Sequence, residues 1–165
     1  GALLLDDTYN ASPESMLAAL NLLDELEGRK VAVLGEMLEL GPYERSGHEM
    51  VGLRAAQVAD LLLTLGERAH IIAEAARRAG MKKSAILEFE EFESLLEWLR
   101  NNLTKEDAVL IKGSHGRPYN IDSGEGLSTF VSSKKIEHVK KDSSFNGHLV
   151  INCLDIFDVV RKNFE

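Results

Sequence analysis

Residues 2–28, ALLLDDTYNASPESMLAALNLLDELEG, contain an apolar run, then a polar loop, then a segment in which Met and Leu recur at helical spacing. The run 2–5 predicts a short buried strand. Ser12 followed by Pro13 is typical of a helix N-cap and the first helical residue. A strand followed directly by a helix is the building unit of an α/β protein.

The same alternation of a short apolar run and a helix-length amphipathic segment recurs along the chain. We expect further strands at 30–34, 60–65, 85–87 and 108–112, and helices at 44–59, 67–79 and 91–103. This alternation predicts the α/β class, with a Rossmann-like, mostly parallel sheet flanked by helices and an additional C-terminal helical tail.

Composition narrows the class of protein further. Leu, Ile, Val and Phe make up 49 of the 165 residues, enough apolar surface for a stable core. The net charge of −8 argues against nucleic-acid binding, and the single Cys153 excludes an internal disulfide or a cysteine-based zinc site. No apolar run reaches the ~20 residues of a membrane span, and the first residues lack the features of a signal peptide, so we expect a cytoplasmic protein.

The composition changes near residue 118, which divides the chain into an expected domain at 1–118 and a tail at 119–165. The tail has one of the nine Arg, four of the six Phe and a cluster of Gly and Ser at 123–133. Its apolar residues predict one face of a helix over 148–164, namely Val150, Leu154, Phe157, Val160 and Phe164. This face either docks on the sheet of the same domain or associates with a protein partner or a second copy. The changed composition favours an unrelated, grafted segment.

Three polar loops follow predicted strands, at 6–12, 36–41 and 112–117. The carboxyl ends of parallel strands share one edge of a sheet, and ligands bind there. We therefore expect Asp7 and Lys112 at the same edge. Asp can accept hydrogen bonds from a ribose, Asn10 can bond a base or a phosphate, and Lys112 can attract an anion. The alternative for Asp6 and Asp7 is that they merely start a helix. The alternative for the loop at 36–41 is a solvated acidic loop, and for Lys112 it is a surface lysine.

Two phosphate-binding motifs are absent from the sequence. There is no G-x-x-x-x-G-K-[ST] and no G-x-G-x-x-G after the first strand. This excludes a chain that is by itself a P-loop ATPase or an ordinary Rossmann dehydrogenase. A nucleotide would need another domain to hold its phosphates.

Four motifs in order resemble one enzyme family. Residues 6–13, DDTYNASP, are similar to the DD-[ST]-YNANP signature of the Mur ligases, in particular those that add D-alanyl-D-alanine to UDP-N-acetylmuramoyl-tripeptide. Residues 33–41, VLGEMLELG, resemble the family's VLGDMLELG, and residues 109–114, VLIKGS, its VLVKGS. His48 with Val51-Gly52 is the remaining match. The resemblance covers only the C-terminal domain of a three-domain enzyme.

The resemblance implies an ATP-dependent amide ligation of peptidoglycan biosynthesis, in which a substrate carboxylate is phosphorylated and then attacked by the amine of the dipeptide. ATP with Mg would be bound mainly by the N-terminal and central domains, together with the UDP-MurNAc-peptide. By motif match, Asp7 would bind the ribose, with Tyr9 and Asn10 along the nucleotide. Lys112, Ser114 and His115 would face the incoming D-Ala-D-Ala. No catalytic residue or metal ligand is implied in this chain, which we expect to be inactive alone.

Two positions depart from the family pattern, and two other functions compete with it. Ser12 replaces the usual Asn, and His115 replaces an Arg, which makes an anion contact weaker and pH-dependent; Arg117 is an alternative donor. The first competing function is an aspartyl-phosphate receiver, which needs a carboxylate after the third strand. Residues 63–66 there are LTLG and contain no carboxylate, so this function is disfavoured. A carrier or binding module that presents the tail helix to a partner is the second alternative.

Overall fold

The computed structural model describes residues 3–6, 11–104, 106–114 and 150–152 of the chain. Its strands are β1 (Leu3–Asp6), β2 (Arg29–Gly35), β3 (Leu61–Leu65), β4 (Ile86–Phe89), β5 (Asp107–Lys112) and β6 (Val150–Asn152). Its α-helices are α1 (Pro13–Asp24), α2 (Glu44–Val58), α3 (His70–Arg78) and α4 (Phe92–Asn102), with short 3₁₀ helices at Gly41–Tyr43 and Lys83–Ala85.

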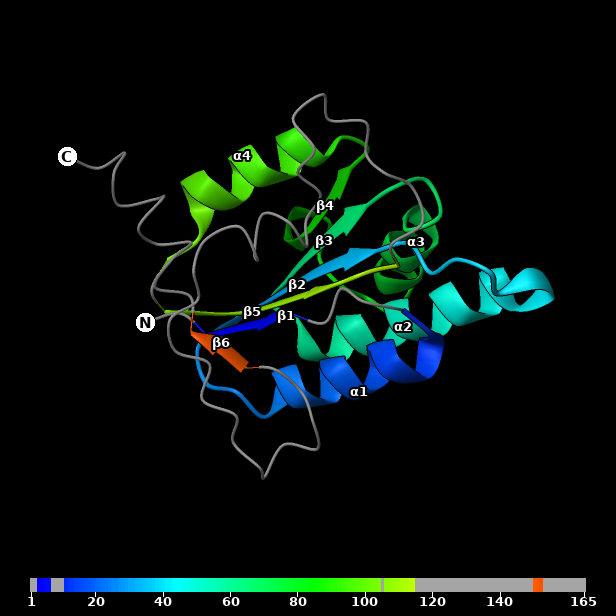
Figure 1. The fold of residues 1–165 in the computed structure, drawn as a ribbon, viewed down its shortest axis with the longest axis horizontal. Coiled ribbons are helices and arrows are strands. Elements are labelled where there is room, and N and C mark those ends of the chain that lie inside the picture. Colours follow the sequence, from blue (N-terminus) through cyan, green and yellow to red (C-terminus); the bar gives the residue numbers. More distant parts are fainter. Residues whose placement is uncertain (1–2, 7–10, 105, 115–149, 153–165) are drawn as a thin grey trace.

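The strands form one sheet in the order β4-β3-β2-β5-β1-β6. The first five strands pair in parallel, and β6 pairs antiparallel with β1 (Figure 1). The α/β class and the mostly parallel sheet are therefore as predicted.

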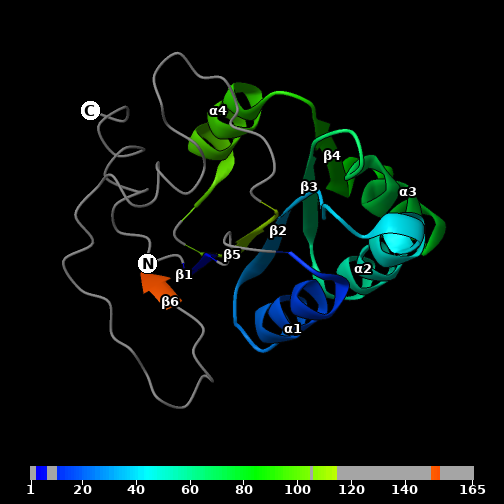
Figure 2. The same ribbon diagram turned by 45° about the vertical axis from the view of Figure 1, so that its right-hand side comes forward.

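The helices divide unequally between the two faces of the sheet. The connections from β1 to β4 all progress in one direction across the sheet, and α1, α2 and α3 cover one face. The connection from β4 to β5 runs in the opposite direction, and α4 packs on the other face (Figure 2). Because such crossovers are right-handed, a reversal of direction places the helix on the opposite face.

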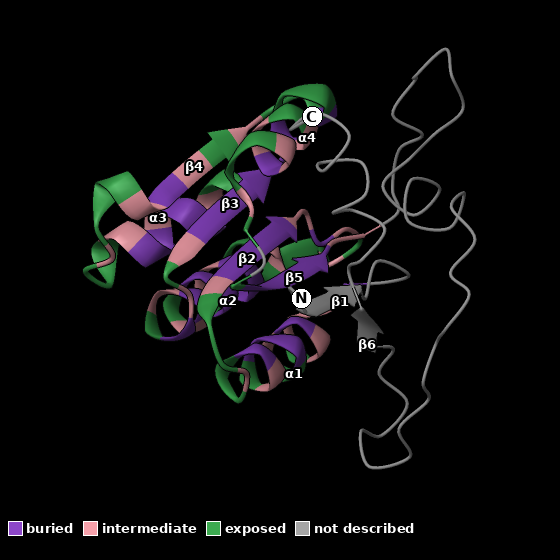
Figure 3. Cartoon of the chain, turned by 90° about the vertical axis from the view of Figure 1, so that its left-hand side faces the viewer, coloured by how far each residue is buried: buried purple, intermediate pink, exposed green. Residues whose placement is uncertain are grey.

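Two apolar cores lie on either side of the central strands. Alternate residues of β5 contribute to each core, with Ala108 and Leu110 facing α1–α3 and Val109 and Ile111 facing the α4 side. All six residues of β5 are buried, as are the inner residues of β2 and β3 (Figure 3). A near-continuous apolar run is the pattern expected of a strand covered on both faces.

The helix starts and ends follow local sequence chemistry. Ser12 caps α1 as predicted: its hydroxyl accepts from the Ser15 N–H at 3.2 Å, and the Ser15 hydroxyl accepts from the Ser12 N–H at 3.0 Å. The helix predicted from Glu67 begins instead at His70, because Gly66 with φ +101° and the next three residues form the turn after β3.

The tail prediction is wrong at its start. Val150 and its two successors form strand β6 on the edge of the sheet, paired with Leu3–Leu5, rather than the first turn of a helix. Residues 153–165, which would hold the rest of the apolar face, lie outside the described residues. The division at residue 118 and the grafted origin of the tail therefore stay predictions.

Candidate functional site

The candidate site lies at the carboxyl edge of the sheet, where β1, β5 and β2 end side by side. In the register of these strands Asp6 is opposite Ile111, and Leu34 is opposite Lys112. The loops after β1, β2 and β5 therefore leave the sheet from neighbouring positions, as expected for a ligand site in an open parallel sheet.

Two glycines allow the loops after β2 and β5 to approach each other closely. A Cβ atom added at Gly113 would lie 2.9 Å from the Cα of Gly35, and one added at Gly35 would lie 3.3 Å from the Cα of Gly113. The first distance is too short for any side chain, because the obstacle is backbone. Gly113 is therefore required by the contact between the loops.

Ser114 joins three loops through its backbone and its hydroxyl. Its N–H donates to the carbonyl of Glu36 at 2.9 Å, and its Oγ accepts from the N–H of Leu38 at 3.3 Å. The same hydroxyl donates to the carbonyl of Ala11 at 3.4 Å, just before the N-cap of α1. The segment after β5 thus holds the β2 loop and the end of the β1 loop together.

The opposite side of the β2 loop is closed by an ionic network. The Glu36 carboxylate accepts from the Arg68 N–H at 2.8 Å and lies 3.8 Å from its guanidinium, and Arg68 Nε donates to Glu44 at 2.9 Å. The Glu36 side chain fills the space beside Gly66, where a Cβ would lie 2.7 Å from it. These contacts occupy the edge above β2 and β3.

The first turn of α1 leaves few N–H groups for an anion. Pro13 has no N–H, the Ser15 N–H is capped by Ser12, and the Met16 N–H donates to the Ser12 carbonyl at 2.9 Å. A phosphate site at a helix N-terminus needs several free N–H groups. This helix end is therefore unsuited to cradle the phosphates of a nucleotide.

Lys112 ends β5 with its side chain buried to 99%. The alternation along the strand places it on the face shared by Ala108 and Leu110, which is the face covered by α1–α3. Surface exposure, the alternative considered for this lysine, is excluded.

The structure describes only some of the predicted site residues. Lys112 and Ser114 lie at the carboxyl edge as expected, although the Ser114 hydroxyl already bonds Leu38 and Ala11. Four residues lie outside the described ones, namely Asp7, Tyr9, Asn10 and His115. Their roles stay predictions, while the end of β1 at Asp6 places the start of their loop at the same edge as Lys112.

Sequence reasoning missed what Gly35 and Gly113 do in this site, and it left the role of His48 open. Gly35 ends one apolar strand and Gly113 directly follows another, which could have marked a close backbone approach. His48 is completely buried and bonds the β2 loop. No local signal distinguishes such a histidine from a solvent-exposed one.

Neither a metal cluster nor a membrane helix occurs in the described part of the chain. Within residues 11–104 and 106–114 no three His, Cys, Asp or Glu side chains are grouped so that they could hold a metal ion. Among the described helices, none has the length and apolar character that crossing a bilayer requires.

The chain belongs to the Mur ligase family: residues 1–115 match the family model described as "Mur ligase, glutamate ligase domain". Within that family it is similar to UDP-N-acetylmuramoyl-tripeptide–D-alanyl-D-alanine ligases. The ligase of Bacillus subtilis is 38% identical over 119 residues, which cover 70% of this chain and 26% of the relative. The ligase of Escherichia coli is 45% identical over 76 residues, which cover 45% of this chain and 17% of the relative.

Solved structures show the same likeness. MurF ligase from Thermotoga maritima, in complex with ADP, aligns with a TM-score of 0.57 and 32% identity, over 69% of this chain and 25% of that one. A MurF structure from Acinetobacter baumannii aligns with a TM-score of 0.58 and 26% identity, over 73% and 26% of the two chains. The chain thus spans about a quarter of the length of these relatives.

Proposed function

We propose that this chain is the C-terminal domain of an ATP-dependent ligase that adds D-alanyl-D-alanine to UDP-N-acetylmuramoyl-tripeptide. The observation that carries the proposal is that the motifs matching the family are also the segments that meet at one edge of the sheet. The matched motifs at 33–41 and 109–114 are the segments that the Gly35–Gly113 contact and the Ser114 hydrogen bonds bring together at one edge.

The proposed role for nucleotide rests on the loop after β1. Asp7 would accept hydrogen bonds from the ribose hydroxyls, with Tyr9 and Asn10 along the nucleotide. The capped first turn of α1 supports a division of labour in which phosphates and Mg are held by other domains. When bound there, ATP would supply the phosphoryl group that activates the substrate carboxylate.

The proposed role for the incoming dipeptide rests on the segment after β5. The buried Lys112 would place a positive charge beneath the rim, where it would attract the dipeptide carboxylate, and His115 would add a second, pH-dependent contact. The proposed partners are the N-terminal and central domains of such a ligase, and the proposed location is the cytoplasm, where UDP-linked precursors are made.

A chimeric enzyme tests this function. Residues 1–118 would replace the corresponding domain of the Bacillus subtilis relative, and phosphate release would be measured with and without D-Ala-D-Ala. We expect dipeptide-dependent release that is lost in an Asp7→Ala chimera. A folded chimera without dipeptide-dependent release would contradict the proposal.

The unmodified chain provides the complementary measurement. We expect no ATP hydrolysis and no ligation by it alone in a coupled assay, because it lacks a phosphate-binding loop. Turnover that survives repurification and is lost in Asp7→Ala would show that the domain carries more of the catalytic machinery than proposed.

A further inference from the structure

His48 is a fully buried histidine next to the β2 loop. It lies in the second turn of α2, with 0% of its surface exposed. Both of its ring nitrogens have hydrogen-bond partners. Nε2 is 3.1 Å from the N atom of Met37, and Nδ1 is 2.7 Å from the carbonyl oxygen of Glu44.

These two contacts fix the tautomer of the ring. The backbone N–H of Met37 can only donate, so Nε2 has to be the acceptor and carries no proton. The Glu44 carbonyl can only accept, so Nδ1 has to carry the proton. The geometry therefore requires a neutral ring, because a protonated imidazole has no acceptor to offer.

The contact with Met37 completes a set of bonds along the loop. Glu36 is held through its carbonyl by Ser114, Met37 through its N–H by His48, and Leu38 through its N–H by the Ser114 hydroxyl. Three successive residues are thus attached alternately to the β5 end and to α2. The Ser114 hydroxyl passes this constraint on to Ala11, at the end of the β1 loop.

We propose that His48 is a positioning residue of the ligand site, which in its neutral Nδ1–H form fixes residues 36–38 and, through Ser114, the end of the β1 loop. The inference deepens the proposed function and rests on it for the identity of the ligand. His48 is not a catalytic residue, since its buried ring bonds two backbone groups. The rigid ring joins a helix to a loop that has no backbone ladder of its own.

The tautomer can be tested in the unmodified chain. Long-range ¹H–¹⁵N correlation spectra distinguish a protonated ring nitrogen from an unprotonated one. We expect a protonated Nδ1 and an unprotonated Nε2 at neutral pH. A proton on Nε2, or on both nitrogens, would overturn the proposal without any need for a variant.

Three variants separate positioning from general stability. In His48→Leu the Met37 N–H loses its acceptor, whereas in His48→Gln the amide oxygen can replace Nε2. We expect exchange of the Met37 amide to become about tenfold faster in His48→Leu, relative to the central-strand amides of Val31 and Val109, and to be largely restored in His48→Gln. The control is His70→Gln, because His70 is exposed and contacts Glu88 instead.

The amide-exchange results that would overturn the role of His48 differ from the results that would count against the proposed function. If Met37 exchange follows the central strands in every variant, or if Gln behaves as Leu does, His48 has only a general structural role. ADP titration of the same proteins tests the link to the ligand: we expect weaker binding in His48→Leu, restored in His48→Gln. Absence of ADP binding to the unmodified chain would count against the proposed nucleotide contact of the loop after β1, while amide exchange would still decide the role of His48.

Discussion

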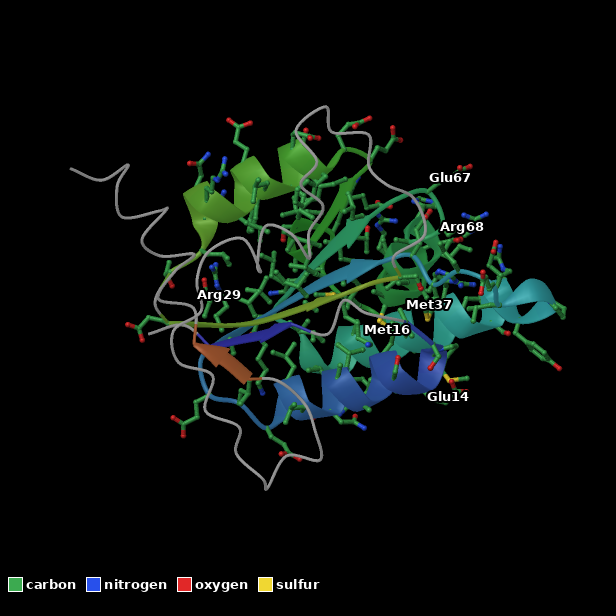
Figure 4. All side chains as sticks on the ribbon, viewed as in Figure 1. Glu14, Met16, Arg29, Met37, Glu67 and Arg68 are labelled. Carbon is green, nitrogen blue, oxygen red and sulfur yellow. The ribbon has the colours of Figure 1, made fainter. Side chains whose placement is uncertain are left out.

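The two edges of the sheet are held together by different kinds of interaction. At the amino edge, Arg29 donates two hydrogen bonds of 2.7 Å to the Asp107 carboxylate, which also accepts from the Thr104 N–H at 2.7 Å. At the carboxyl edge an ionic network of Glu36, Arg68 and Glu44 lies beside β3. The loops after β1, β2 and β5 are joined there by neutral hydrogen bonds of Ser114 and His48 and by contact between two glycines. Arg29 lies at the opposite end of the sheet from Met37 and Arg68 (Figure 4).

This difference indicates that the amino edge contributes to stability, whereas the carboxyl edge is the one that we propose for ligand binding. The Asp107 side chain is buried, and its carboxylate is satisfied within the domain by three hydrogen bonds, two from Arg29 and one from the Thr104 N–H. The pKa of Arg29 is raised above its usual value, chiefly by the hydrogen bond with Asp107. At the carboxyl edge the bonds that Ser114 and His48 make to the loops go to backbone groups of Ala11 and of residues 36–38.

The largest expected effect concerns the amino edge. Asp107→Ala removes a buried carboxylate and leaves the Arg29 guanidinium and the Thr104 N–H without their partner. We expect a loss of about 2–4 kcal/mol in the free energy of unfolding, measured in urea, since Arg29 is partly exposed and water offsets some of the cost. Asp60→Ala, at an exposed position of the same edge, should cost less than about 1 kcal/mol. Equal losses would remove the distinction between structural and surface charges.

The next largest loss of stability is expected from a steric clash between the loops at the carboxyl edge. Gly113→Ala places a methyl group 2.9 Å from the Cα of Gly35, so the loops have to separate. We expect a loss of about 2 kcal/mol together with changed amide shifts at 35–38. Gly41→Ala is the control, because Gly41 has φ +54° but no atom within 4 Å of the added Cβ. If both variants changed the shifts at 35–38 equally, the close approach of the loops would not be what holds them.

A smaller loss of stability is expected when a single hydroxyl group is removed from the carboxyl edge. Ser114→Ala leaves the Leu38 N–H without its acceptor, and we expect it to cost about 1 kcal/mol and to perturb the amides of Leu38 and Ser12. Ser46→Ala, which removes an exposed hydroxyl bonded to the Tyr43 carbonyl, should change stability by less than about 0.5 kcal/mol. The pair is measured by urea unfolding and by amide spectra. A neutral Ser114→Ala would show that the hydroxyl does not join the loops.

The smallest effect lies on the helical surface, away from both edges. The hydrogen bond from Arg78 lowers the pKa of Glu49 below its usual value of 4.5. A group with a lowered pKa in the folded state stabilises the protein above the unfolded pKa, and this contribution is lost as the pH falls through the folded pKa. Arg78→Met should therefore reduce the melting temperature slightly at pH 7 and have no effect well below pH 4. An equally large difference at low pH would show that Arg78 acts through packing.

The sequence was most informative where local chemistry decides the structure. Ser12-Pro13 predicted the start of α1 because capping involves residues three apart. The apolar runs predicted the parallel strands because burial on both faces leaves a continuous pattern. By contrast, Arg29 and Asp107 are 78 positions apart, and nothing local indicates their pairing.

The wrong prediction at the tail shows the limit of periodicity. Val150 fits the helical spacing of the following apolar residues, but it lies in a β-favouring Val-Ile pair, and the open edge of β1 provides a partner for its backbone. For the site, the order of strands and loops placed the matched segments at one edge of the sheet, while the pairing of Gly35 with Gly113 and the bonds of His48 depend on tertiary contacts.

Titration of the ¹⁵N-labelled chain with ADP, followed through its amide spectrum, tests most directly the claim that the carboxyl edge is the functional one. We predict that millimolar ADP shifts the amides of residues 7–12, 36–38 and 113–114, while those of Arg29, Thr104 and Asp107 stay unchanged. Shifts centred on the amino edge, or no shift along the carboxyl edge, would contradict the account.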